Sequence, residues 1–115
     1  MISRIVLLTV QPGRIREFRT SLNEEFIPKI QTQAGFIENI ESLDPNTGKF
    51  CCITLWQTPA DEERYGKGLF QEMSRKLAPI LAASMTVNTL PVENASAHKI
   101  HAGKAGMGQN KKLAA

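Results

Sequence analysis

The chain begins with a run of apolar residues in which both alternating faces are hydrophobic. From Ile2 to Val10 this run predicts a β-strand that is covered on both sides, and Pro12-Gly13 ends it. Phe36 to Leu43 and Phe50 to Trp56 predict two more strands, because the turn-forming residues from Asp44 to Gly48 favour an antiparallel hairpin. The first half of the chain is therefore expected to supply three strands.

Residues 15–30 carry apolar side chains at helical spacing, which predicts an amphipathic helix. Pro28 lies inside this pattern and predicts a kink or a new turn, and Gly35 marks the end of the helix. A second helical region follows the hairpin. It is expected to contain a short helix from Ala60 to Tyr65, a break at the glycines that follow, and a helix with apolar residues from Leu69 to Ile80.

Met85 to Leu90 predicts a final strand, so the order strand, helix, strand occurs twice. This order predicts an α+β fold of the ferredoxin-like type, β-α-β-β-α-β, in which helices cover one face of a four-stranded antiparallel sheet. The other face would be bare, although Ile2 to Val10 and Cys51 to Trp56 carry apolar residues on both faces. A second copy of the chain is the simplest cover for such a face, so we expect a homodimer.

The chain has 115 residues, which is room for one domain, and a formal net charge of +3. Residues 1–93 hold ten basic and eleven acidic side chains, so the positive charge comes from four lysines after them. This distribution predicts a solvated tail rather than a nucleic-acid-binding arm, and no nucleic acid partner is expected. We expect a domain over residues 1–93 and a basic tail over 94–115, whose last residues resemble a vector-derived remnant.

The only two cysteines, Cys51 and Cys52, are adjacent, and neighbouring Cα atoms about 3.8 Å apart are too close for an ordinary disulfide. They are expected to be reduced packing residues of a cytoplasmic protein. No apolar stretch reaches the length of a transmembrane helix, and the first strand is too short for a signal peptide, so no membrane partner is expected. His98 and His101 lack a third ligand, so no metal site is expected.

Four short segments lie at the ends of the predicted elements. They are Val10-Gln11-Pro12-Gly13, Gln33-Ala34-Gly35-Phe36, the Asp44-Pro45 hairpin and Ile53-Thr54-Leu55-Trp56-Gln57-Thr58-Pro59-Ala60. Together, over about residues 1–91, they resemble the antibiotic biosynthesis monooxygenase family of dimeric α+β barrel proteins. The last segment is similar to the tryptophan that ends the family's third strand, followed by the start of a helix.

The resemblance implies a dimer in which two sheets form a barrel, with a pocket in each protomer between the sheet and the helices. In the monooxygenase members this pocket oxidises phenolic or quinol-type substrates with O₂ and uses no metal or flavin. The protein would supply an apolar, water-poor cavity and a few hydrogen bonds that hold the substrate anion. We therefore expect a small apolar or aromatic ligand and no cofactor.

The resemblance places Trp56 at the family's tryptophan position, where it would form a wall of the pocket, although a core aromatic would also fit. Val6 takes the place of an asparagine, and Tyr65 that of a histidine, in haem-degrading relatives, so haem degradation is not expected. Tyr65 could donate a hydrogen bond to a substrate oxygen or be a half-exposed helix residue. The candidate catalytic residues are Trp56 and Tyr65, and the candidate substrate-binding residues are Val6, Asn39, Thr54 and Phe70.

Three further polar residues leave alternatives open. Asn39 and Asn88 could orient a substrate carbonyl or be ordinary strand-edge or hairpin residues, and Arg4 is either a strand-edge charge or the partner of a bound anion. Two functions follow. The first is a cofactor-independent monooxygenase acting on a quinol or phenol, which the retained Trp56 favours. The second is a non-catalytic, small-ligand-binding or stress-associated dimer, which the missing asparagine and histidine favour.

Overall fold

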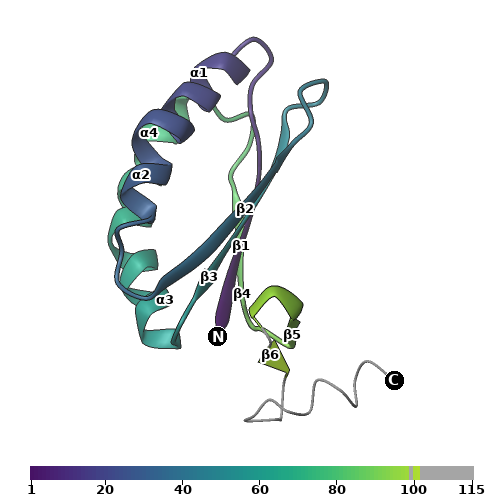
Figure 1. Ribbon diagram of the computed structural model, residues 1–115. Coiled ribbons are helices and arrows are strands. Elements are labelled where there is room, and N and C mark those ends of the chain that lie inside the picture. The colour runs from purple at the N-terminus through teal and green to yellow at the C-terminus, as the bar shows by residue number, and fades with distance from the viewer. Residues whose placement is uncertain (99, 102–115) are drawn as a thin grey trace.

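The computed structural model describes residues 1–98 and the backbone of residues 100 and 101 (Figure 1). The strands are β1 (Ile2–Thr9), β2 (Phe36–Leu43), β3 (Lys49–Trp56), β4 (Thr86–Pro91), β5 (Asn94–Ala95) and β6 (Ile100–His101). The helices are α1 (Ile15–Ser21), α2 (Ile27–Ile30), α3 (Pro59–Lys67) and α4 (Leu69–Leu77), with shorter or irregular turns η1 (Leu22–Phe26), η2 (Ala78–Ile80) and η3 (Ser96–His98).

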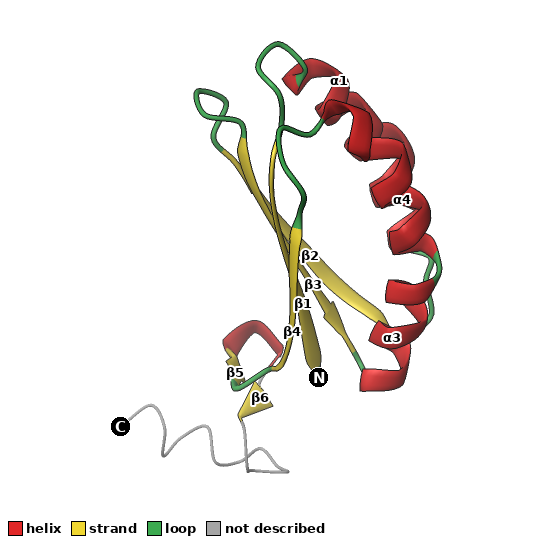
Figure 2. Cartoon of the chain, turned by 180° about the vertical axis from the view of Figure 1, so that it is seen from behind, coloured by secondary structure: helices red, strands yellow, loops and turns green. Residues whose placement is uncertain are grey.

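The main sheet has four strands in the order β2-β3-β1-β4, and every neighbouring pair is antiparallel. This order, with the helices on one face, is the ferredoxin-like α+β arrangement, so the predicted fold is confirmed (Figure 2). Because side chains alternate along a strand, Val6 and its opposite neighbour Cys52 point to the helices, as do Leu8 and Phe50.

The first helical region is continuous but changes its hydrogen-bonding pattern. The α-helical turns of α1 pass into the π-helical turns of η1 and return to α-helix at Ile27. Pro28 lies in the first turn of α2, where its missing N–H is tolerated. The new turn expected at the proline is therefore confirmed, and Phe18, Phe26 and Ile30 are buried along the same face.

The second helical region departs from the prediction in one respect. Thr58 caps α3 by accepting a hydrogen bond from the Asp61 amide at 3.1 Å, but the helix continues to Lys67 instead of ending at Tyr65. Gly66 remains helical, and only Gly68 leaves the helical conformation. The helix break was therefore predicted too early in the sequence, because the low helix propensity of glycine was considered without the tertiary packing around Gly66. A Cβ atom on Gly66 would lie 2.7 Å from Nη1 of Arg4, so a larger residue there would have to displace the Arg4 side chain.

The face of the sheet opposite the helices is apolar and partly open. Leu7, Ile40 and Leu90 are 47%, 48% and 54% exposed on this face, and Ile5 and Ile53 lie between them. An exposed apolar surface in the centre of a sheet is unusual for a protein that acts alone. The second apolar face expected from the sequence is therefore confirmed.

The segment from β5 to β6 lies on this same face, at the end of the sheet where β1 begins (Figures 1 and 2). Nε2 of His98 is 2.7 Å from Oε1 of Glu38, which joins the segment to β2. Ser3 and Leu55 are buried at this end of the face. Residues 94–98 are mostly exposed and return to the sheet at His98, while the lysines at 99–112 and the terminal residues lie outside the described residues, so the solvated tail stays a prediction. The domain boundary at residue 93 stays a prediction.

Candidate functional site

A narrow cavity of about 40 Å³ lies between the sheet and the helices. Its lining is almost entirely apolar and comes from β1, α2, β3, α3, α4 and the loop before β4. The lining residues are Val6, Leu8, Ile30, Phe50, Cys52, Thr54, Tyr65, Phe70, Met73, Ser74, Leu77 and Met85. Four of the six residues predicted from the sequence are among them: Val6, Thr54, Tyr65 and Phe70. Their roles stay predictions.

An aromatic cluster of Trp56, Tyr65 and Phe70 lies at the cavity, and Tyr65 and Phe70 form part of its wall. The rings of Trp56 and Tyr65 are stacked, with centroids 4.6 Å apart and planes 26° apart, and Phe70 meets Tyr65 edge-on at 5.9 Å. Trp56 has no exposed surface and does not line the cavity, so it supports Tyr65 from behind. Tyr65 is only 4% exposed, which corrects the expectation of a half-exposed helix tyrosine.

Thr54 connects the stack to the sheet. Nε1 of Trp56 donates a hydrogen bond to Oγ1 of Thr54 at 2.9 Å, and Thr54 is itself 2% exposed. The indole N–H is a donor only, and a buried donor needs an acceptor. This bond therefore fixes the orientation of Trp56, on which Tyr65 stacks.

The two titratable groups that line the cavity are held in their neutral forms. Burial raises the pKa of Tyr65 well above its ordinary value, with smaller contributions from Cys52 and Glu41, and Arg4 opposes the shift. Burial also raises the pKa of the Cys52 thiol to about 12. At neutral pH the cavity therefore presents an O–H and an S–H donor, and Cys52 is not a thiolate nucleophile.

A buried ion pair lies beside the aromatic stack. Nη1 of Arg4 is 2.5 Å from Oε2 of Glu62, and the two side chains are 11% and 9% exposed. The guanidinium carbon of Arg4 lies 4.1 Å from the ring centroid of Phe70, and Oγ1 of Thr89 donates to Oε2 of Glu62 at 3.4 Å. Arg4 belongs to β1, which has a neighbour on each side, so its interpretation as a strand-edge charge is wrong.

A second carboxylate on the helix-facing side of the sheet, that of the partly buried Glu41, lies on β2. Glu41 pairs across the sheet with Cys52, and its Oε2 is buried without a hydrogen-bond partner among the described residues. Burial raises the pKa of Glu41, and a hydrogen bond with the Asn39 side chain opposes the shift. Asn39 lies opposite Thr54 but does not line the cavity. The sequence analysis did not select Glu41. Strand alternation could have indicated it, because Glu41 lies two residues after Asn39 and therefore on the same, helix-facing side of β2.

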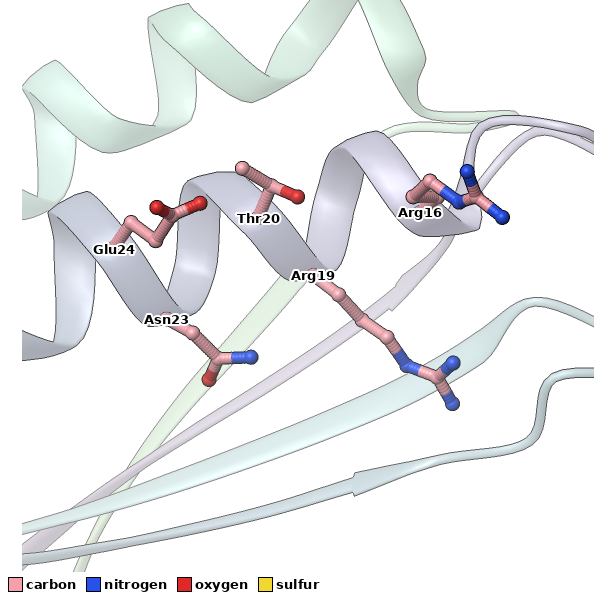
Figure 3. Close-up of a pocket in the computed structure, with 5 residues that line it drawn as sticks. All are labelled: Arg16, Arg19, Thr20, Asn23 and Glu24. Carbon is pink, nitrogen blue, oxygen red and sulfur yellow. The ribbon is translucent and has the colours of Figure 1, made fainter.

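A larger hollow of about 280 Å³ lies on the outer surface of α1 and η1. It is formed by Arg16, Arg19, Thr20, Asn23 and Glu24 (Figure 3). Arg19 and Asn23 project to one side of the helix and Thr20 and Glu24 to the other, so the polar groups do not converge on one point (Figure 3). A binding site needs convergent groups, and we therefore take the inner cavity as the candidate site.

Among the described residues, no group of three or more His, Cys, Asp or Glu side chains is placed to hold a metal ion. His98 contacts Glu38, and the side chain of His101 lies outside the described residues. Within the same part of the chain, no helix is long and apolar enough to cross a membrane.

Comparison with known proteins gives similarity at the level of three-dimensional structure. No family model matches the sequence, and no curated protein matches it. A mutant of SnoaB, a cofactor-independent oxygenase from Streptomyces nogalater, is 14% identical with a TM-score of 0.68, over 83% of this chain and 95% of that one. The ActVA-Orf6 monooxygenase of Streptomyces coelicolor, in complex with nanaomycin D, is 12% identical with a TM-score of 0.68, over 82% and 88%.

A protein of unknown function from Nitrosomonas europaea has a TM-score of 0.71 at 14% identity, over 83% of this chain and 91% of that one. Sequence identities of this size establish a shared fold, and shared fold does not by itself establish a shared reaction. The neighbours support the resemblance drawn from the sequence motifs.

Proposed function

We propose that this chain, which has the fold of the antibiotic biosynthesis monooxygenases, is a cofactor-independent monooxygenase acting on a small phenol or quinol. The observation that carries the proposal is the inner cavity, which combines an apolar lining with the neutral donors of Tyr65 and Cys52. Two structural neighbours with this fold are oxygenases by name. Both cysteines are free, which fits a reducing cytoplasm.

The chemistry needs little from the protein. A phenol that loses its proton becomes electron-rich enough to reduce O₂ directly. One oxygen atom then bonds to a ring carbon to give a quinone, and the other leaves as water with the hydrogens lost from the phenol O–H and the ring C–H. An apolar cavity strengthens hydrogen bonds to the anion, so the hydroxyl of Tyr65 is the residue expected to stabilise it.

The cavity must widen to hold such a substrate. Ligand pockets are usually roughly 300–1,000 Å³, whereas this cavity is about 40 Å³. Met73 and Met85 line it, and methionine side chains are flexible enough to change rotamer without distorting the backbone. We expect these two side chains to move when the substrate enters.

A second copy of the chain is proposed to cover the open sheet face formed by Ile5, Leu7, Ile40, Ile53 and Leu90. Sedimentation should therefore show a dimer at micromolar concentration, and Ile40→Glu should dissociate it, because a charge would be placed in an apolar interface. Arg75→Glu, on the exposed side of α4, is the matched control. A wild-type monomer would contradict this part of the proposal.

The enzymatic proposal is tested by oxygen uptake with hydroquinones and anthrone-like phenols. Uptake should exceed the spontaneous rate, and Tyr65→Phe should lower kcat by about 10–100-fold, an effect in the range of one lost transition-state hydrogen bond. Met73→Leu is a matched control in the same lining that removes no donor. If Tyr65→Phe is folded and retains the wild-type kcat, the hydroxyl has no catalytic role.

The alternative is a non-catalytic dimer that holds a small apolar ligand in the same cavity. The absence of an asparagine at Val6 and of a histidine at Tyr65 favours this second function. It predicts a concentration-dependent rise in Tm with hydroquinones or naphthols, without oxygen consumption. Oxygen uptake that the Tyr65→Phe variant lacks would exclude it.

A further inference from the structure

Glu41 is a carboxylate placed where a carboxylate is costly. It lies on β2 with its side chain on the helix-facing side of the sheet, and Oε2 is buried with no partner in the described chain. A buried carboxylate that lacks full hydrogen bonding destabilises the folded state. Glu62, which is buried on the same side of the sheet, is by contrast paired with Arg4 and accepts a hydrogen bond from Thr89. Glu41 therefore remains available to react.

Glu41 is not in the lining of the cavity but borders it through its neighbour on β3. Cys52, its opposite neighbour on β3, lines the cavity, and Asn39 lies two residues away on the same face of β2. Glu41 also contributes to the electrostatic environment of Tyr65 on α3. Glu41 thus lies on the β2 side of the cavity, next to Cys52 in its wall, and forms no ion pair with the described residues.

We infer that Glu41 is the general base that removes the proton from the hydroxyl group of the aromatic substrate. The inference rests on the proposed oxygenase function and names the residue that starts its chemistry. The substrate O–H bond breaks, the proton bonds to Oε2 of Glu41, and the electron pair stays on the substrate oxygen. The neutral O–H of Tyr65 and S–H of Cys52 can then donate to that oxyanion.

The electrostatics support this assignment. A general base works best when its pKa approaches the operating pH, and burial raises the pKa of Glu41 from that of an ordinary glutamate. Tyr65 and Cys52 have pKa values raised by burial too, so neither can act as the base at neutral pH. The proton acceptor and the two donors therefore have separate roles.

The first experiment detects proton transfer without oxygen. Under anaerobic conditions, 2-hydroxyanthraquinone changes its visible absorption when it ionises. Wild-type protein should shift its apparent pKa downward by at least one unit on binding, Glu41→Gln should not, and Glu63→Gln, an exposed carboxylate on α3, should behave as wild type. Thermal unfolding of each variant confirms that it is folded.

The second experiment measures the pH dependence of kcat/KM with 1,4-dihydroxynaphthalene. Glu41→Gln should lower kcat/KM by about 10²–10⁴-fold at neutral pH, the usual range for general-base catalysis. The loss should diminish at alkaline pH, where the quinol ionises in solution. A purely structural role for Glu41 would lower the rate equally at all pH values.

The two experiments together distinguish a failure of the general-base assignment from a failure of the proposed oxygenase function. If the wild-type protein ionises the probe and Glu41→Gln does not, but no oxygen is consumed, the oxygenase function is wrong and the role of Glu41 as proton acceptor is retained. If oxygen is consumed but both proteins ionise the probe, or neither does, Glu41 is not the base and the oxygenase function stands.

Discussion

The buried pair of Arg4 and Glu62 allows a quantitative prediction about stability. Replacing Glu62 by Leu leaves the Arg4 guanidinium without its carboxylate, in a site where the side chain is 11% exposed. Its Nε already has no partner among the described residues. The ring of Phe70 lies 4.1 Å from the guanidinium carbon, and Gly66 packs close to Nη1, so the site is crowded around the cation.

Removal of one partner of a buried ion pair costs about 3–5 kcal/mol, because the remaining charge is desolvated and uncompensated. For a domain of this size 1 kcal/mol lowers Tm by roughly 4 °C, so Glu62→Leu should lower Tm by roughly 12–20 °C. Replacing both residues, as Arg4→Met with Glu62→Leu, removes the charge as well as its partner. The double variant should recover most of the lost stability.

The free energy of unfolding is measured by urea denaturation followed by circular dichroism, at one protein concentration because association affects stability. Glu63→Leu, one residue along α3 and exposed, should change it by less than about 0.5 kcal/mol. The reasoning is refuted if Glu62→Leu costs less than 1 kcal/mol, or if the double variant is no more stable than Glu62→Leu.

Three further predictions concern single positions. Gly48→Ala should lower Tm by more than about 8 °C, since φ is +79° and a Cβ would lie 2.4 Å from the Val10 carbonyl oxygen; Lys49→Ala, exposed and adjacent, is the control. Thr54→Val should lower the free energy of unfolding, measured by urea denaturation, by about 1–3 kcal/mol, because the Trp56 indole N–H loses its acceptor. Thr54→Ser keeps the hydroxyl, so an equal loss of stability in that variant would show that the hydroxyl is not responsible. Burial raises the pKa of Glu41 above its unfolded value of 4.5, so the native state retains a proton that the unfolded state has lost. Stability should therefore fall as pH rises from about 4.5 through the raised pKa, and Glu41→Gln should remove this fall in thermal scans from pH 4 to 8; an equal difference between the two proteins at both ends of that range would contradict it.

Local patterns of the sequence determined the order of the elements and the class of fold. The alternation in residues 36–43, the turn residues before Lys49 and the helical spacing from Ile15 each depend on neighbours within a few positions. The apolar second face was equally predictable, because strand alternation alone shows that both sides of β1 are hydrophobic. These features are readable from the sequence because they arise from the geometry of a single strand or helix.

The candidate site was predictable only in part. Tyr65, Thr54, Phe70 and Val6 line the cavity, but the sequence could not show that Tyr65 separates Trp56 from it. Tertiary structure decided this, because the ring of Tyr65 stacks on that of Trp56 only when α3 packs against the sheet. The choice depends on distances between elements, which no periodicity contains.

Charged residues show most clearly which features depend on the sequence alone and which depend on tertiary structure. Sequence alone determined that Arg4 lies on a strand and that Glu41 and Glu62 are carboxylates on a strand and a helix. Only the tertiary structure decided that Arg4 pairs with Glu62, that Gly66 makes room for the pair, and that Oε2 of Glu41 has no partner in the described part of the chain. The return of residues 94–98 to the open face was decided in the same way. The physical reason is that the energy of a charge depends on burial and on its partners, and both are set by residues that packing brings together from distant parts of the chain.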